Sequence, residues 1–183
     1  MKITFLGTGT SQGVPVIGCN CEVCLSKYSE DKRLRSSVLI EGDNTTVVID
    51  TGPDFRQQML RENIQKLDAV LFTHEHKDHI AGLDDVRAFN FKLKKDMPIY
   101  ASSGVQKALE REFHYVFSAY QYPGIPKVQL HTIDAESNFS IGDIPFQSIE
   151  VMHHKMKVLG FRINDLVYIT DVNYIDDKQL QKI

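Results

Sequence analysis

Short apolar segments with the composition of β-strands alternate with helix-type segments along the whole chain of 183 residues. Hairpin signals join two strand pairs, at 42–44 in the first third and 164–165 in the last third. Hairpins mixed with helices favour one layered α/β domain over residues 1–183, with mixed rather than purely parallel sheets. The expected strands are Lys2–Leu6, Ser37–Ile40, Thr46–Ile49, Ala69–Phe72, Pro98–Ala101, Val128–Ile133, Phe146–Met152, Gly160–Ile163 and Val167–Thr170; the expected helices are Asp54–Glu62, Ile80–Phe89, Gly104–Phe117 and one beginning at Ile175, and 120–127 is expected to be a loop.

Net charge and apolar runs exclude several classes of protein. The formal net charge is −3, whereas avid nucleic-acid binders usually have a strongly basic face. The one dense basic run, 92–95, is followed at once by Asp96 and is interpreted as a solvated edge. No apolar run approaches the ~18 residues of a membrane span. The N-terminal segment 1–7 meets glycine too early for a signal peptide, so we expect a cytoplasmic protein without membrane contact.

The expected strand Ala69–Phe72 runs into four potential metal ligands within six residues, namely His74, His76, Asp78 and His79. A strand end followed by a tight loop can aim several side chains at one point, because the sheet fixes the base of the loop. Imidazole and carboxylate together suit zinc, manganese or iron. The alternative is a polar, solvated loop, which is disfavoured because the chain has only seven histidines and three of them lie here. The sequence therefore predicts a metal centre at the end of this strand.

The pattern His74-x-His76-x-Asp78-His79 resembles the signature of the metallo-β-lactamase family of hydrolases. The resemblance implies a four-layer αββα sandwich that carries two divalent metal ions at one edge. It also implies that the two first histidines bind one ion and that Asp78 and His79 bind the other. The family adds a later histidine to the first ion and an aspartate that bridges both ions.

Both later ligands have candidates at the ends of expected strands. Asp171 follows Val167–Thr170 and resembles the bridging aspartate; a solvated strand-end acid is the alternative. Phe146–Met152 is followed by His153 and His154, and neighbouring residues on a strand point to opposite faces, so only one can be the inward ligand. The segment that begins at His153 resembles the family's His-x-Lys-Leu segment, which favours His153 and leaves His154 as the alternative ligand.

Asp50 closes the strand Thr46–Ile49 and matches a family aspartate that lies beside the metals. The implied role is to accept a hydrogen bond that orients a ligand imidazole. The alternative is a turn or helix cap. The segment 51–58, which follows, also resembles one branch of the family.

A glycine-rich loop from Gly7 to Gly18 follows the first expected strand. It lacks the Gly-Lys-Ser/Thr ending of a P-loop, and its glycine spacing does not fit a dinucleotide-binding fingerprint. Together with the histidine cluster, the loop resembles the N-terminus of the family branch that contains ribonuclease Z and a phosphoribosyl cyclic phosphodiesterase.

All three cysteines of the chain, Cys19, Cys21 and Cys24, lie close together in the sequence. In a reducing compartment such a cluster favours a metal site over a disulfide framework. Three thiolates can hold one zinc ion and leave the fourth tetrahedral position open. A similar cluster in the cyclic phosphodiesterase implies a third, structural zinc with a distant histidine; His114 and His131 are the local candidates, and three free thiols are the alternative.

The family pattern includes one more histidine, which completes the second metal site from the C-terminal part. No histidine follows His154, so the second ion would have Asp78, His79 and Asp171 and lack its last protein ligand. We therefore expect the chain to cover an incomplete family domain. The alternative is a short chain that a partner completes or that has no catalytic activity.

The resemblance implies hydrolysis of a small phosphodiester such as a cyclic one. Two ions ~3.5–4 Å apart would share a hydroxide that attacks phosphorus in line with the leaving alkoxide. Asp78 would position the water or carry its proton, and Lys155 is a candidate acid for the leaving group.

Three other functions stay open: a thioester or other ester hydrolase of the same fold, a tRNA-processing nuclease, and a non-catalytic metal-binding domain. A β-lactamase is disfavoured because no export signal is present. A polynucleotide substrate is disfavoured because its binding depends on phosphate neutralisation by Lys and Arg, and this chain is acidic. Analogy with the family also implies a homodimer.

Overall fold

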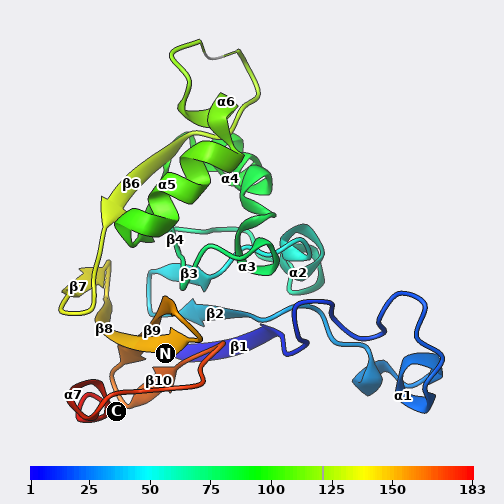
Figure 1. Ribbon diagram of the computed structural model, residues 1–183. Helices are drawn as coiled ribbons and strands as arrows, with labels where there is room; N and C mark the ends of the chain where they lie inside the picture. The colour runs from blue at the N-terminus through cyan, green and yellow to red at the C-terminus, as the bar shows by residue number, and fades with distance from the viewer. Residues whose placement is uncertain (121) are drawn as a thin grey trace.

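Two β-sheets pack face to face, and helices lie outside them, in a computed structural model that describes residues 1–120 and 122–183 (Figure 1). Gln121, in the segment predicted to be a loop, lies outside the described residues. Among the described residues, no helix combines the length and the apolar character that crossing a membrane requires.

The first sheet has the strand order β1-β2-β3-β4-β5-β6, so sequence neighbours are also neighbours in space. The pairs β1/β2 and β2/β3 are antiparallel, and the pairs from β3 to β6 are parallel. Helices therefore connect the parallel strands, as such crossovers require. The strands are β1 (Lys2–Gly7), β2 (Ser37–Glu41), β3 (Thr46–Ile49), β4 (Ala69–Leu71), β5 (Met97–Ala101) and β6 (Val128–Thr132).

The second sheet is antiparallel, with the strand order β10-β9-β8-β7. Its long central hairpin turns between His153 and Met156, which face each other as the last pair of β8 and β9. The strands are β7 (Asn138–Ile141), β8 (Ile144–His153), β9 (Met156–Ile163) and β10 (Leu166–Tyr168).

Alternating side chains of the first sheet serve two separate cores. In β2, Val38 and Ile40 face the second sheet, whereas Leu39 faces the helices. In β4, Leu71 and Val70 divide in the same way. A strand buried on both faces needs apolar residues at successive positions, which explains the continuous apolar runs in the sequence.

Helices cover the outer face of the first sheet and bury Phe55, Ile80, Phe89 and Leu109 against it. On the outer face of the second sheet, Ile175 packs over a small cluster just before the last helix. The layers therefore follow the order helix, sheet, sheet, helix, which confirms the predicted mixed α/β sandwich. The α-helices are α1 (Glu22–Leu25), α2 (Phe55–Arg61), α3 (Lys77–Ile80), α4 (Arg87–Leu93), α5 (Ser103–Glu112), α6 (His114–Phe117) and α7 (Asp177–Leu180); the 3-10 helices are η1 (Ser29–Asp31) and η2 (Leu83–Val86).

Two predicted helices are wrong in extent. The predicted helix 80–89 is divided among α3, η2 and α4, because the amide of Gly82 donates to the carbonyl of Thr51, 2.7 Å away, instead of continuing the helix. The predicted helix 104–117 is interrupted at Phe113, whose φ of −118° and ψ of 41° separate α5 from α6.

The second sheet contains more strand than predicted. The sequence analysis missed β7, whose one buried residue, Ile141, gives a weak apolar pattern. It also began β9 at Gly160, although pairing starts at Met156. In contrast, β10 ends at Tyr168, two residues before the predicted end at Thr170.

The segment that carries α1 and η1 extends away from both sheets as an arm (Figure 1). The loop before the arm is tied to the body, because the amide of Gly9 donates to the carbonyl of Leu34, 2.7 Å away. In addition, Arg35 Nε donates to the carbonyl of Ser11 over 2.9 Å and Arg35 Nη1 lies 2.9 Å from Asp54 Oδ1. The glycine-rich loop is therefore held at the edge of the first sheet.

Candidate metal centre

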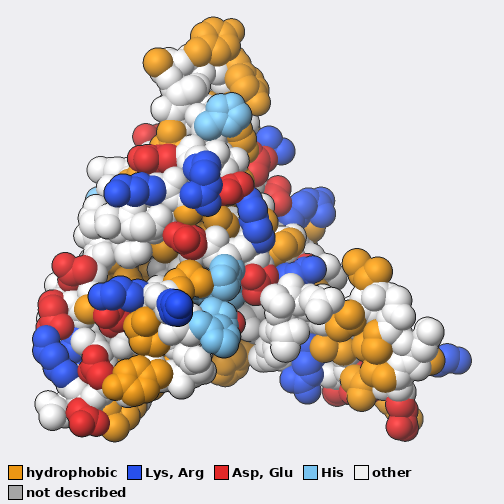
Figure 2. All heavy atoms as spheres, viewed as in Figure 1, with side chains coloured by type: hydrophobic (Ala, Val, Ile, Leu, Met, Phe, Trp, Pro, Cys, Tyr) orange, Lys and Arg blue, Asp and Glu red, His pale blue; other side chains and the backbone are white. Residues whose placement is uncertain are grey.

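The predicted ligands come from strand ends of both sheets and meet at one end of the sandwich. His74 and His76 lie in the loop after β4, and α3 supplies Asp78 and His79 from the same loop. The second sheet contributes its own side chains from the end of β8 and from the segment after β10. Figure 2 shows histidine side chains gathered near the middle of the viewed face, with basic and acidic side chains around them.

The histidines lie in direct contact. His74 Nε2 is 3.1 Å from His76 Nδ1, and the ring centroids of His74 and His79 are 4.1 Å apart. From the second sheet, the His153 ring lies 5.4 Å from that of His76 and 6.1 Å from that of His74. The structure therefore brings histidines from both sheets to one place.

Three carboxylates surround His79, which is almost fully buried. His79 Nε2 is 3.2 Å from Asp78 Oδ2 and 3.1 Å from Asp171 Oδ2, and His79 Nδ1 is 2.7 Å from Asp50 Oδ2. Asp50 and Asp171 both adopt left-handed backbone conformations, with φ of 65° and 49°. Such conformations are uncommon outside glycine and cluster at functional sites.

Asp50 controls the orientation of two imidazoles through a buried hydrogen-bond network. It accepts hydrogen bonds from His79 Nδ1 and from the amide and hydroxyl of Thr73, at 2.7, 2.9 and 2.8 Å. Because the Thr73 hydroxyl donates to Asp50, it accepts from His74 Nδ1, 2.9 Å away. Both Nδ1 atoms are thereby occupied, so the Nε2 atoms of His74 and His79 face the other ligands. Sequence reasoning missed Thr73, although its place directly before His74 was a usable signal.

The surroundings shift the pKa values of His74 and His79 in opposite directions. Burial, together with the charge of the neighbouring His79, lowers the pKa of His74 to about 4. Burial also opposes protonation of His79, but the surrounding carboxylates outweigh it and raise its pKa. The hydrogen bond to His79 in turn lowers the pKa of Asp171. Without an ion, the site holds a neutral His74 next to a protonated His79 at neutral pH.

His153, rather than His154, lies with the other candidate ligands. His153 is half-buried and lines the same pocket as His76 and Asp171, whereas His154 is exposed and is not among the described residues that line it. His154 instead has a positive φ of 54° in the β8–β9 turn, and its amide donates to Asn173 Oδ1 over 3.0 Å.

The pocket in front of the ligands has a volume of about 420 Å³ and a wall of hydroxyl groups. The glycine-rich loop supplies part of this wall, and β2 is preceded by Ser36, which donates to the carbonyl of Gly9 over 3.0 Å. Thr170 donates to Asp171 Oδ2 over 2.7 Å. Sequence reasoning identified the loop but not these hydroxyls, which are Thr8, Thr10, Ser11, Ser36 and Thr170.

The donor set fits divalent metal ions. One ligand atom from each of His74, His79 and Asp171 lies within 4.8 Å of the others, and each of the three is buried or half-buried. Mixed nitrogen and carboxylate donors suit zinc, manganese and iron. His74 and His79 each have their Nδ1 atom bonded to an acceptor, as metal-binding histidines usually do.

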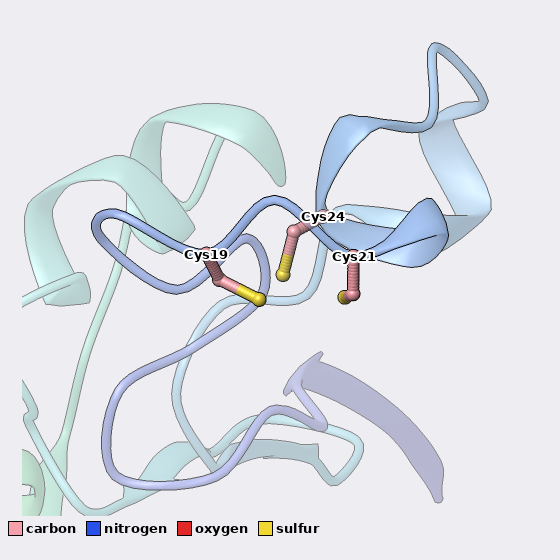
Figure 3. A group of neighbouring side chains, drawn as sticks. All are labelled: Cys19, Cys21 and Cys24. Carbon is pink, nitrogen blue, oxygen red and sulfur yellow. The ribbon is translucent and has the colours of Figure 1, made fainter.

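The cysteines form a second group on the arm. The Sγ atoms of Cys19, Cys21 and Cys24 lie within 4.8 Å of one another and point toward a common space (Figure 3). The Cys24 amide lowers the pKa of Cys21, which favours the thiolate needed for metal binding. The two histidines considered as local partners lie elsewhere: the ring of His131 stacks on Tyr100 in the sandwich, and His114 contacts Tyr115 on α6. Neither could complete this group, because β6 and α6 lie far from the arm (Figure 1).

Comparison with known proteins places this geometry in a family. The family described as "Beta-lactamase superfamily domain" matches residues 45–183. A diphosphatase from the PhnP family has a solved structure that is 38% identical, with a TM-score of 0.89 over 98% of this chain and 69% of that one. Zinc-bound PqqB from Methylobacterium extorquens shares the fold, with a TM-score of 0.79 at 20% identity over 100% of this chain and 69% of that one.

Curated relatives are longer than this chain. A protein from Porphyromonas gingivalis named octanoyltransferase is 39% identical over 182 residues, which are 99% of this chain and 37% of that protein. Ribonuclease Z from Prochlorococcus marinus is 26% identical over 176 residues, which are 90% of this chain and 50% of the nuclease. The family match covers the ligand-bearing part of the chain, and the two packed sheets agree with it: this chain belongs to the β-lactamase superfamily and has the metallo-β-lactamase fold.

Proposed function

We propose that this chain carries the metal centre of a metal-dependent phosphodiesterase that acts on a small phosphodiester. One observation carries the proposal: histidines and carboxylates from both sheets converge beside a pocket of about 420 Å³ with a hydroxyl-lined wall. Hydroxyl groups can donate hydrogen bonds to the oxygens of a phosphate group.

Six side chains would hold two divalent ions, with zinc favoured and manganese or iron as alternatives. When bound, the ions supply an activated water and neutralise charge on the phosphate oxygens. The first ion would be held by His74, His76 and His153, and the second by Asp78, His79 and Asp171.

The residues around the ions have separate roles. Asp78 is half-buried beside the pocket, where its carboxylate can accept a proton from the attacking water. Asp50 orients the imidazoles and stays behind them, fully buried. Hydroxyls of the glycine-rich loop, which Arg35 holds in place, would donate to the phosphate oxygens.

The relatives support a phosphorus-containing substrate more than an acyl group. The diphosphatase resembles 98% of this chain at 38% identity, and ribonuclease Z also has a name that implies phosphodiester cleavage. The name octanoyltransferase belongs to a protein of which this chain matches 37%. The net charge of −3 favours a small substrate over a polynucleotide.

Replacing Asp78 by alanine tests the proposal. The wild-type chain, loaded with zinc or manganese, should hydrolyse bis(4-nitrophenyl) phosphate, and Asp78→Ala should reduce turnover by roughly 10²-fold or more. The matched control is Asp85→Ala, which removes a half-buried carboxylate from η2 outside the pocket lining and should retain both turnover and metal content. Unchanged turnover in Asp78→Ala would contradict the proposal.

A substrate panel separates the proposed function from its alternatives. The panel holds a small phosphodiester, a thioester and a precursor tRNA, each assayed with the metal-loaded chain. Selective cleavage of the small phosphodiester supports the proposal, whereas preference for the thioester or the tRNA replaces it. Stoichiometric metal without turnover of any substrate would indicate a non-catalytic metal-binding domain.

A further inference from the structure

A second cavity, which we call the side cleft, lies beside the metal pocket. It has a volume of about 560 Å³ and lies between the start of α5, the β6–β7 connection and the β8–β9 hairpin. A volume of this size is within the range of small-molecule sites. His74 lines the side cleft and His76 lines the metal pocket, and their ring centroids are 4.8 Å apart. A ligand that places one group among the histidines can therefore extend another group into the side cleft.

The floor of the side cleft is apolar. Val105, Ile133 and Leu159 line it and are 3–5% exposed. Met156 adds a half-buried side chain from the beginning of β9. A flat or compact organic group that packs on these side chains buries apolar surface, and this burial favours binding.

The rim of the side cleft is polar, and most of its charges are already paired. Lys157 lies 3.0 Å from Glu150, and Asp134 accepts hydrogen bonds within its own turn. By contrast, Glu75 and Lys155 have no ion pair or hydrogen bond from their side chains within residues 1–120 and 122–183. Both flank the metal centre: Glu75 lies between two candidate ligands, and Lys155 lies two residues after His153.

Glu75 also faces the beginning of α5. A β-carbon added to Gly104 would lie 4.0 Å from Glu75 Oε2, so the carboxylate reaches across to this side of the side cleft. A carboxylate can only accept hydrogen bonds. It therefore favours a ligand group that donates one and disfavours a second anionic group.

We infer that the side cleft holds the organic substituent of the phosphodiester, and that Glu75 selects substituents that carry a hydrogen-bond donor. The inference rests on the proposed function, since the phosphate has to lie at the metal centre. The apolar floor binds the body of the substituent, and the unpaired Glu75 carboxylate accepts its donor. Glu75 is thus a specificity-determining residue and is not one of the six proposed metal ligands.

Phosphonates test the side cleft without any catalytic step. Methylphosphonate, phenylphosphonate and (4-hydroxyphenyl)phosphonate are titrated calorimetrically into the metal-loaded chain. Methylphosphonate reports on the metal centre alone, whereas the ring of phenylphosphonate has to occupy the side cleft. Burying the ring should make phenylphosphonate bind roughly tenfold more tightly than methylphosphonate.

Filling the side cleft should abolish this preference. Ser103 is exposed and lines the side cleft at the first position of α5, so Ser103→Trp should bring phenylphosphonate to the affinity of methylphosphonate. The control Lys107→Trp adds the same ring at an exposed position of α5 outside the lining and should keep the preference. Equal affinities in the wild type, or an unchanged preference in Ser103→Trp, would overturn the inference.

Glu75→Ala tests the donor selectivity. The wild type should bind (4-hydroxyphenyl)phosphonate several-fold more tightly than phenylphosphonate, and the variant should lose this gain while it keeps its affinity for methylphosphonate. A fall in methylphosphonate affinity would mean that Glu75 acts on the metal centre and would overturn its proposed role. If neither simple phosphonate binds the loaded wild type, the proposed function fails; if both bind equally, only the side cleft is refuted.

Discussion

Asp50 is the buried acceptor on which the orientation of two imidazoles depends. It is fully buried and takes three hydrogen bonds, two of them from Thr73. Through the Thr73 hydroxyl it also fixes His74. One carboxylate therefore positions histidines that are assigned to different ions, so its loss should affect both sites.

Asp50→Asn should lower metal affinity without removing a ligand. The amide cannot accept at both of its polar atoms, so one of the bonds to His79 or Thr73 is lost. Loss of such an orienting partner typically costs 10–100-fold in metal affinity. A competition titration with a zinc indicator measures the change.

Asp68→Asn is the matched control for this substitution. Asp68 accepts from the Thr46 amide at the opposite end of the same sheet, over 2.9 Å. The control should bind zinc like the wild type. Equal zinc affinity in Asp50→Asn and Asp68→Asn would contradict the orienting role of Asp50.

Metal binding should release a proton from His79 near neutral pH. The raised pKa keeps the metal-free imidazole protonated, whereas a ligand imidazole has to be neutral. His74 has a lowered pKa and is already neutral at pH 7, so it releases no proton when it binds an ion. Metal affinity should therefore rise with pH between about 6 and 9, because protons compete with the ion for His79.

Calorimetry in two buffers of different ionisation enthalpy counts the released protons. His79→Ala, as the control, should abolish the release from this position. Proton-free metal binding at pH 7 would contradict the charged state assigned to His79.

The same pKa shift predicts that the stability of the metal-free fold changes with pH in the opposite direction to the metal affinity. A raised folded-state pKa contributes stability that is present below the ordinary histidine pKa, ~6.5, and lost as pH rises through the raised value.

At the scale of elements, the loop after β3 and the helix α3 approach each other backbone to backbone. The Thr51 amide donates to the carbonyl of His79 over 2.8 Å, and the Gly82 amide donates back to Thr51 over 2.7 Å. A β-carbon on Gly52 would lie 2.1 Å from the carbonyl oxygen of Asp78. The absence of a side chain at Gly52 thus allows α3 to carry its ligands next to Asp50.

Gly52→Ala should destabilise the fold and weaken metal binding together. Relief of the clash requires movement of α3, and overpacking of this kind typically costs about 1–3 kcal/mol. Urea unfolding of the metal-free chain measures the stability, and zinc titration measures the displaced ligands. Gly104→Ala is the control, because its added carbon would meet nothing closer than 3.9 Å. Wild-type stability in Gly52→Ala would show that the close approach of Gly52 to α3 does not contribute to the stability of the fold.

At the scale of the whole molecule, the metal centre joins the two sheets. His74 and His76 belong to the loop after the first sheet's β4, whereas His153 ends β8 of the second sheet. Asp171 follows β10 and contacts His79 across the same junction. Bound ions would therefore hold the ligand-bearing ends of both sheets together, and metal binding should stabilise the folded chain.

Removal of metal should lower the melting temperature. An ion present at 100 times its Kd stabilises the fold by about 2.7 kcal/mol, which for a chain of this size is roughly 5–11 °C. Thermal unfolding with zinc and with excess chelator measures the shift. His74→Ala should show a much smaller shift, since it removes a ligand from the centre. An identical melting temperature with and without chelator would contradict the role of the centre in joining the sheets.

The sequence by itself determined the features that are local along the chain. Short apolar runs predicted the strands β2, β3 and β4, and the structure shows that successive residues of these strands are buried. Four candidate ligands fall within six residues after β4, so their spacing alone indicated a metal centre. The weakly apolar β7 and the break at Phe113 escaped prediction, because tertiary contacts outweigh local preference there.

Only the tertiary structure decided how residues far apart in the sequence meet. Thr73 and Asp50 are separated by 23 positions, yet their hydrogen bonds set the orientation of His74. The structure also placed His153 rather than His154 beside the other ligands, and it formed the side cleft from three separate elements. Sequence periodicity specifies which face of an element is apolar, but the packing of the two sheets fixes which polar strand ends converge, because that depends on strand order and twist.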